Sequence, residues 1–190
     1  MTILYRLLAL LCFCTIAPHA AATTELKFLT EFGYVGFAVE DSWPIVSMQS
    51  KLPIAVATFQ IPNEADEDTP DSTNLAIVFY QHGDATAEKA LSEVGELLSA
   101  VPPAVEEHGA WKIYRQRAMQ ASTWYTVLDA RRELEKGAAS VRLAWPELAG
   151  NAPDYDAQMR RTFDQVLASI HAFVGQYSPK PGEVIRRPSS

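Results

Sequence analysis

Both cysteines of this 190-residue chain lie near its start, and this placement restricts how the rest of the chain can be held together. Cys12 and Cys14 belong to an apolar stretch, and no cysteine follows residue 22. The remainder therefore has no disulfide, no thiol nucleophile and no thiolate metal site. It depends on its hydrophobic core, which a domain of ~150 residues can supply because folding buries about 68–70% of its surface.

Residues 1–22 have the composition of a secretory signal peptide. Arg6 gives a positive start, Leu7–Ile16 is apolar, and Ala20-Ala21-Ala22 offers small residues for cleavage. The apolar run is too short for a membrane-spanning helix, which needs about 20 residues. We therefore expect a mature chain that begins near Thr23, has lost both cysteines, has no integral membrane segment, and is periplasmic or secreted.

The charge balance argues against nucleic acid as a partner. The chain has 16 Lys and Arg against 23 Asp and Glu, and its formal net charge is −7. Nucleic acids are bound through clustered Lys and Arg, whereas the basic residues here form brief pairs: Arg131-Arg132, Arg160-Arg161 and Arg186-Arg187. The acidic balance is typical of a soluble exported protein or of one that meets a basic partner.

The mature chain shows no change of composition that divides it and no internal repeat. We expect one globular domain over residues 23–177. A flexible tail rich in Pro and Ser should occupy 178–190, because it has no apolar face to pack. An exposed loop is expected at Pro62–Ser72, where the sequence PNEADEDTPDS combines five acids with two prolines.

Segments with strand-like patterns occupy both halves of the domain. Asn74–Tyr80 contains the continuous apolar run LAIVFY, whose short length is typical of a buried strand and not of a helix. Glu135-Lys136-Gly137 is a turn short enough to require an antiparallel hairpin. The expected strands are Leu26–Leu29, Gly36–Val39, Trp43–Gln49, Ile54–Ile61, Asn74–Tyr80, Ala110–Met119, Thr123–Leu134 and Ala138–Pro146.

Two segments have the three-and-four spacing of an amphipathic helix. The first runs over Ala87–Val101, with Asp84 as its N-cap. The second opens at Asn151 or Asp154 and carries apolar residues as far as Phe173. The elements predict an α+β fold in which a mostly antiparallel sheet of about six or seven strands is packed by two main helices.

The order of these elements resembles the PsbP-like family, which is named for an extrinsic photosystem subunit and includes small exported bacterial proteins. The matching residues are Phe37-Ala38-Val39 before Ser42-Trp43, the helix near 85–101, Trp111-Lys112-Ile113-Tyr114 and Tyr125-Thr126-Val127-Leu128. The resemblance covers about residues 26–175. It implies an α/β/α sandwich and a scaffold role against larger partners, and it transfers no catalytic residue. The acidic loop has no counterpart in it.

Residues that could carry metal or catalytic chemistry do not stand in known motifs. His82, His108 and His171 have no metal-ligand spacing, and no serine stands in GxSxG or SxxK. We therefore expect no metal and no cofactor. Asp129 and Glu133 share one face of a strand and could do acid and base work on sugars, but an exposed charged face is the simpler interpretation.

The acidic loop is the candidate binding segment. Its oxygen ligands would suit calcium, but an EF-hand that starts at Asp66 would have Pro70 at position five, Asp71 at the glycine position and Ile77 in place of the final Glu. A solvated loop that contacts a cationic partner is the better interpretation. The candidate binding residues are Glu64, Asp66, Glu67, Asp68 and Asp71.

These observations favour an exported, soluble, non-enzymatic module that binds a protein partner in the bacterial envelope. One version is an immunity or inhibitor protein for a secreted toxin, which would use the acidic loop. The alternative is a periplasmic carrier of a small hydrophobic or lipid-like ligand, held between a helix and the sheet by Trp and Phe. A lesser alternative is a hydrolase with a non-standard site.

Two structural features would separate these hypotheses. The hydrolase needs two or more of His82, His108, Asp129, Glu133 and a serine to converge within hydrogen-bond reach. The carrier needs a cavity lined by aromatic side chains. The four tryptophans, Trp43, Trp111, Trp124 and Trp145, are more simply expected to pack in the core, because each buries ~150–250 Å².

Overall fold

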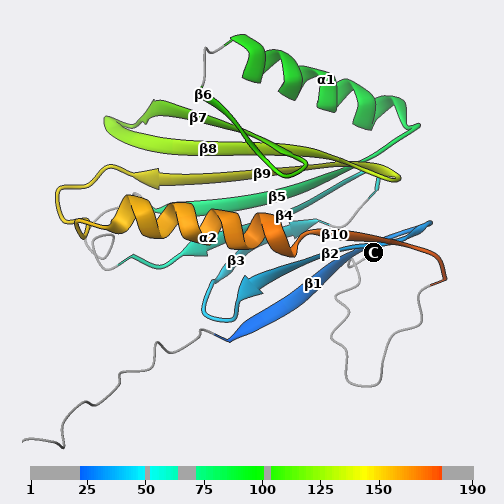
Figure 1. Cartoon of the computed structure of the whole chain (residues 1–190), viewed down its shortest axis with the longest axis horizontal. Coiled ribbons are helices and arrows are strands. Elements are labelled where there is room, and N and C mark those ends of the chain that lie inside the picture. Colours follow the sequence, from blue (N-terminus) through cyan, green and yellow to red (C-terminus); the bar gives the residue numbers. More distant parts are fainter. Residues whose placement is uncertain (1–21, 50–51, 64–71, 101–103, 177–190) are drawn as a thin grey trace, which may run out of the picture.

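The computed structural model describes residues 22–49, 52–63, 72–100 and 104–176 (Figure 1). The expected signal peptide, the acidic residues of the loop and the tail at 178–190 lie outside these ranges, apart from Ala22. Neither α1 (Ala85–Ala100) nor α2 (Tyr155–Ser169), the helices of the described part, combines the length and hydropathy needed to cross a membrane.

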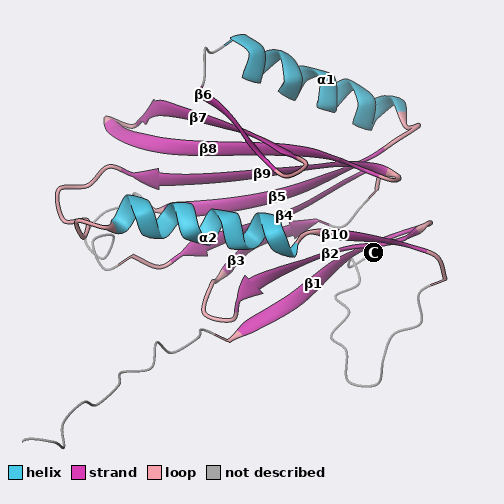
Figure 2. Ribbon diagram, viewed as in Figure 1, coloured by secondary structure: helices cyan, strands magenta, loops and turns pink. Residues whose placement is uncertain are grey.

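Strands dominate the described part, and they form two antiparallel sheets (Figure 2). The order of the larger sheet is β3 (Ile45–Gln49), β4 (Ile54–Ile61), β5 (Thr73–Gln81), β9 (Gly137–Pro146), β8 (Thr123–Leu134), β7 (Trp111–Gln120) and β6 (Ala104–His108). The smaller sheet has the order β1 (Thr23–Thr30), β2 (Gly33–Glu40) and β10 (His171–Val174). The α+β fold with a seven-stranded antiparallel sheet and two helices is confirmed.

Alternation along the strands gives the larger sheet two different faces. Leu75 and Ile77 of β5 enter the main core, together with Phe163 of α2 and with Phe28 and Phe37 of the smaller sheet. All five are at most 1% exposed. One face of the larger sheet is therefore covered by α2 and the smaller sheet, and α2 crosses in front of the strands in Figure 1.

The opposite face of the larger sheet is covered by α1. The residues between them form a small separate cluster, in which Ala87 and Leu91 of α1 contact Tyr80 and Ala138. Further along the helix Leu97 is 70% exposed. The second face is thus covered less completely than the first.

The N-terminus of α1 confirms the expected cap. The Oδ1 atom of Asp84 accepts hydrogen bonds from the backbone N–H groups of Thr86 at 2.8 Å and Ala87 at 3.2 Å. These bonds satisfy two donors of the first turn that have no partner within the helix. Asp154 directly precedes α2, as one of the two expected starts, but makes no side-chain cap bond there.

The expected end of the second helix was wrong. α2 stops at Ser169, and Ile170 is extended with φ −73° and ψ 122°. The Ser169 hydroxyl accepts a bond from the Ala38 N–H at 2.9 Å, which ties this end to β2. His171 and Phe173, expected on the helix, instead form β10, because pairing with β2 supplies the backbone bonds that a longer helix would have made.

Several strands also differ from expectation, and β1 and β2 each begin three residues earlier than expected, at Thr23 and Gly33. β6 was not foreseen, since its sequence AVEEH shows little alternation and its partner β7 alone supports it at the edge of the sheet. β3 begins at Ile45, whereas Trp43 belongs to the preceding turn, where its N–H bonds to the Glu40 carbonyl at 3.1 Å.

Three tryptophans pack as expected and one does not. Trp43, Trp111 and Trp145 are 7%, 4% and 1% exposed and belong to the main core. Trp124 is 42% exposed, next to Arg117, whose guanidinium lies 4.7 Å from the centre of its ring. Trp124 is therefore available at the surface.

Two glycines should respond in opposite ways to a methyl group. A Cβ on Gly137 would overlap the Tyr80 carbonyl oxygen and the Phe79 ring, whereas one on Gly95 would meet only the mobile end of Arg131. We expect Gly137→Ala to destabilise the fold by about 1–3 kcal/mol through overpacking. Gly95→Ala, in the middle of α1, should stabilise it by about 0.5–1 kcal/mol. Urea unfolding monitored by circular dichroism measures both, and a stabilised Gly137→Ala variant would contradict the described β5–β9 contact.

Candidate functional site

A cavity of about 480 Å³ lies between α1 and the larger sheet. This volume is within the range of about 300–1,000 Å³ that is typical of small-molecule sites. Four strands and the helix contribute to its lining, which consists of Ala76, Val78, Tyr80, Val94, Leu97, Leu98, Gln116, Asp129, Ser140 and Arg142.

The apolar part of the lining comes from α1 and β5. Val94, Leu97 and Leu98 follow one another on the C-terminal half of α1, while Ala76 and Val78 alternate along β5. Leu98 is 7% exposed and Leu97 is 70% exposed. The helix therefore closes the cavity at Leu98, whereas the cavity is open to solvent at Leu97. We call Val94, Leu97 and Leu98 the apolar roof of the cavity.

The polar part of the lining centres on an ion pair between neighbouring strands. Asp129 of β8 stands directly opposite Arg142 of β9. Arg142 donates to the two carboxylate oxygens, from Nε at 2.7 Å and from its Nη2 atom at 3.1 Å, and the Gln116 amide donates a third bond at 2.9 Å. Asp129 is 5% exposed, whereas the Arg142 side chain is 56% exposed. The carboxylate is therefore buried and fully paired, and the guanidinium reaches toward the cavity.

Two hydroxyl groups complete the polar surface. Tyr80 is 7% and Ser140 is 9% exposed, and neither hydroxyl bonds to another described residue. Burial raises the pKa of Tyr80, so its hydroxyl stays protonated and can donate. The hydrogen bond to Asp129 raises the pKa of Arg142, which keeps its charge. These groups offer hydrogen-bond donors to anything in the cavity.

The N-terminal half of α1 is held to the sheet by polar contacts. The ring nitrogens of His82 lie 3.1 Å from Glu88 on α1 and 3.1 Å from Glu133 on β8. The hydrogen bond from His82 lowers the pKa of Glu88. Arg131 bonds to Glu133 at 3.2 Å and to the Leu91 carbonyl at 3.4 Å. The half of α1 above the cavity has no such anchor among the described residues.

The residues that the hydrolase hypothesis names come together only in part in the described ranges. His82 and Glu133 do converge, but no serine hydroxyl bonds to either of them there. Asp129 is engaged with Arg142, and the expectation that it lies on an exposed charged face was wrong, because it is 5% exposed and lies on the sheet side of the cavity under α1. Asp129 and Glu133 do lie on the same face of β8, because side chains four positions apart along a strand point to the same side.

The cavity differs from the one that the carrier hypothesis described. It lies between a helix and the sheet, as expected, but neither Trp nor Phe lines it. Arg142, Gln116 and Tyr80 were not identified from the sequence as site residues. The sequence does contain a signal for the ion pair. The turn at Glu135-Lys136 sets the register of the hairpin, and this register places Asp129 opposite Arg142.

The candidate binding residues Glu64, Asp66, Glu67, Asp68 and Asp71 all lie outside the described residues. The positions beside this segment are described. The Asn63 amide donates to Asn151 at 3.0 Å, and the hydroxyls of Thr73 and Tyr155 lie 2.7 Å apart. Both flanks of the acidic segment are therefore tied to the start of α2 and the loop before it.

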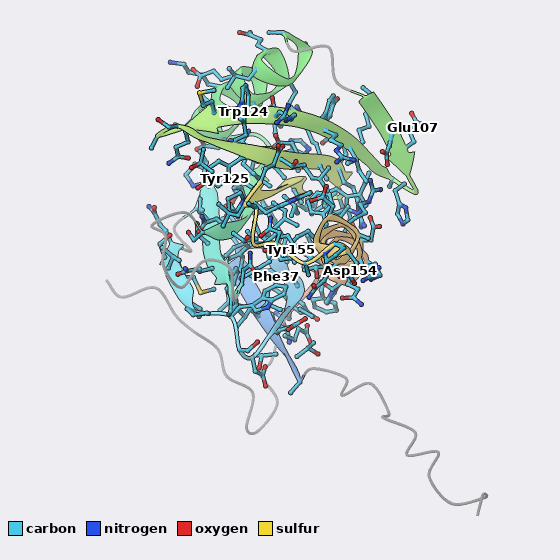
Figure 3. The ribbon with its side chains drawn as sticks, turned by 90° about the vertical axis from the view of Figure 1, so that its left-hand side faces the viewer. Phe37, Glu107, Trp124, Tyr125, Asp154 and Tyr155 are labelled. Carbon is cyan, nitrogen blue, oxygen red and sulfur yellow. The ribbon has the colours of Figure 1, made fainter. Side chains whose placement is uncertain are left out.

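A second hollow of about 610 Å³ lies at this same end of the molecule. Its charged side chains are largely paired, with Arg117 donating to Glu147 at 2.8 Å and Thr126 donating to Glu147 at 3.0 Å. The bond from Arg117 lowers the pKa of Glu147. In Figure 3, which faces this end, Trp124 lies on the strands above Tyr155. The lining is more polar than that of the cavity under α1.

Metal-ligating side chains do not gather in the described ranges. No group of three or more His, Cys, Asp or Glu that could hold a metal ion occurs there. His108, at the end of β6, contacts neither His82 nor His171 by any bond between described residues.

The ion pair at the cavity should respond asymmetrically to the loss of either partner. Arg142→Met leaves a buried carboxylate without its main donor, so we expect a loss of about 3 kcal/mol. Asp129→Asn leaves a half-exposed guanidinium that water can solvate, and should cost about 1 kcal/mol. Arg115→Met is the control, because Arg115 is 55% exposed and 3.8 Å from Asp156, and it should change stability by less than about 0.5 kcal/mol. Urea unfolding measures all three, and equal losses for the first two would contradict the burial of Asp129.

No protein-family model matches the chain, and no curated protein matches it. Among solved structures, a protein of Bacteroides thetaiotaomicron VPI-5482 is similar over 78% of this chain, with 12% identity and a TM-score of 0.47. The chain spans about half of that protein, 48% of its length. LpqN of Mycobacterium tuberculosis, described as involved in cell envelope biogenesis, is similar over 78% of this chain and 89% of its own, with 13% identity and a TM-score of 0.43. At these values the likeness transfers no function.

Proposed function

We propose that this protein is an exported, non-enzymatic binding protein that holds a small ligand with an apolar chain in the cavity beneath α1. The observation that carries the proposal is the cavity itself, where the apolar residues of α1 face a polar floor formed by Tyr80, Gln116, Asp129, Ser140 and Arg142 of β5, β7, β8 and β9. Ligand sites combine mostly apolar walls with a few well-placed polar groups.

The cavity is not an ordinary packing gap. The main core on the other face of the sheet consists of buried apolar residues, whereas the sheet side of this cavity also has the buried polar residues Tyr80, Asp129 and Ser140. Beneath α1 the polar residues hold one another in place, because Asp129 is paired with Arg142 and Gln116. The site is therefore preformed, which lowers the cost of binding.

The anchoring of α1 supports access to the cavity. Polar contacts of His82 and Arg131 hold the N-terminal half of the helix, while the C-terminal half only covers the cavity with Val94, Leu97 and Leu98. A ligand can enter beside Leu97 without breaking the polar contacts. Export is inferred from the composition of residues 1–22, which suits a role in the periplasm.

Cavity filling tests this proposal. Ala76→Phe places a ring in the cavity, whereas Ala118→Phe adds the same ring at an exposed position of β7 outside it. We expect the wild-type mature protein to bind N-phenyl-1-naphthylamine, an uncharged apolar fluorophore. Ala76→Phe should weaken this binding at least tenfold, and Ala118→Phe should leave it unchanged. Absence of binding to the wild type, or equal binding by all three proteins, would refute the proposal.

A protein partner in the envelope is the second candidate function. The observation that favours it is the exposed Trp124, which is stacked against Arg117 at the end where both flanks of the acidic segment are tied down. Trp and Arg are enriched among the residues that dominate binding energy in protein interfaces. The immunity or inhibitor role is one version of this candidate.

Paired surface variants test the second candidate. We expect the mature protein to capture a partner from an envelope fraction, and Trp124→Ala to reduce the recovered amount at least tenfold, because an exposed anchor residue would be lost. Val46→Ala, at a 58% exposed position on β3, is the control and should recover the same amount as wild type. Unchanged capture by Trp124→Ala would exclude this surface.

A further inference from the structure

We propose that the ligand of the cavity beneath α1 is an uncharged single-chain acyl ester or amide, whose carbonyl group accepts hydrogen bonds from Arg142, Ser140 and Tyr80. This inference rests on the proposed ligand-binding function and adds the chemistry of the head group.

The polar groups of the floor are mainly hydrogen-bond donors. The Tyr80 and Ser140 hydroxyls bond to no other described residue, and the Nη1 atom of Arg142 makes none of the bonds to Asp129. The amide nitrogen of Gln116 is already used by Asp129. A head group in this position therefore finds several donors, which an acceptor such as a carbonyl oxygen satisfies. A head group that only donates, such as an ammonium, would leave them unpaired.

The polar floor also has no net charge. Arg142 and Asp129 are the charged residues of the lining, and they neutralise each other at 2.7 Å. Next to them Arg131 is paired with Glu133, which also contacts His82. A carboxylate that enters the cavity would lose its hydration and find no unpaired positive charge in the lining, which is costly. A neutral carbonyl avoids that cost.

The roof further disfavours an anion. α1 carries Glu88, Glu93 and Glu96 against Lys89, and it has no basic residue in its last turn. The carbonyl end of a helix has a partial negative charge, and this is the end that covers the cavity with Leu97 and Leu98. The charges of α1 and the pairing of Arg142 thus point in the same direction, toward an uncharged acceptor.

The apolar roof defines the other end of the ligand. A chain that starts at the polar floor can run along Val94 and Leu98 and leave beside Leu97, which is 70% exposed. A single acyl chain suits this path. The cavity volume of about 480 Å³ is in the lower half of the range for ligand sites, which favours one chain over two.

Two ligands with the same acyl chain test the head-group chemistry. Glycerol monolaurate carries an uncharged ester, and laurate is ionised at pH 8. Both are titrated at pH 8 against the mature protein loaded with N-phenyl-1-naphthylamine, and displacement of the fluorophore gives the affinities. We expect glycerol monolaurate to bind at least tenfold more tightly than laurate. Ser140→Ala should weaken monolaurate binding about fivefold by removing one donor.

Two variants that change the charge near the cavity give a second test of the preference for an uncharged head group. Asp129→Asn keeps the shape of the floor but leaves Arg142 uncompensated, so the affinity ratio should move at least tenfold toward laurate. Glu96→Lys, at an exposed position on α1, does not disturb the floor and should move the ratio in the same direction by about twofold or more. The Glu96 variant keeps the test valid if Asp129→Asn folds poorly.

The outcomes separate this inference from the function on which it rests. If laurate binds as tightly as glycerol monolaurate, or if neither charge variant changes the ratio, the inference is overturned while ligand binding stands. If neither the fluorophore nor any acyl ligand binds, both fail.

Discussion

The larger sheet has two broad faces, and the chain covers them unequally. On one face α2 and the smaller sheet together bury Phe28, Phe37, Phe59 and Phe163 completely. On the other face a single helix of 16 residues has to cover strands from β4 to β7. Because no cysteine lies in the described part, the first face must supply most of the stability, and each fully buried Phe contributes about 1.5–3 kcal/mol. The second face is then free to carry polar groups and a cavity.

The parts of the fold that follow from local patterns were predictable. The hairpin between β8 and β9 depends on a short turn, and the N-cap of α1 depends on Asp84 alone, so both could be recognised in the sequence. β10 could not, because the apolar spacing of Ile170 and Phe173 continues the helical pattern of α2. Its strand conformation comes from pairing with β2, more than 130 positions earlier in the chain.

The candidate site also depends on contacts between distant segments, which local sequence patterns do not reveal. Asp129 and Arg142 could have been paired from the hairpin register, but the sequence does not say which face α1 would cover. The sequence therefore predicts an exposed Asp129, whereas the residue is 5% exposed. Gln116 enters the site from β7 because β7 pairs with β8, and Val94 enters from a helix that precedes all three strands. A site assembled from five elements depends on tertiary packing, and no short motif encodes it.

The ion pair explains how such a thinly covered face can stay ordered. A buried carboxylate without partners would destabilise the fold, and a guanidinium alone would draw water under the helix. Pairing of Asp129 with Arg142 across adjacent strands satisfies the carboxylate and links β8 to β9, while Gln116 of β7 donates to the Oδ2 atom of the same carboxylate. Contacts within the sheet thereby fix the polar floor, and the helix above it contributes apolar contacts. The polar groups of the sheet and the apolar residues of α1 therefore lie on opposite sides of the cavity, and among the described residues the hydrogen bonds of Asp129 come from the sheet alone.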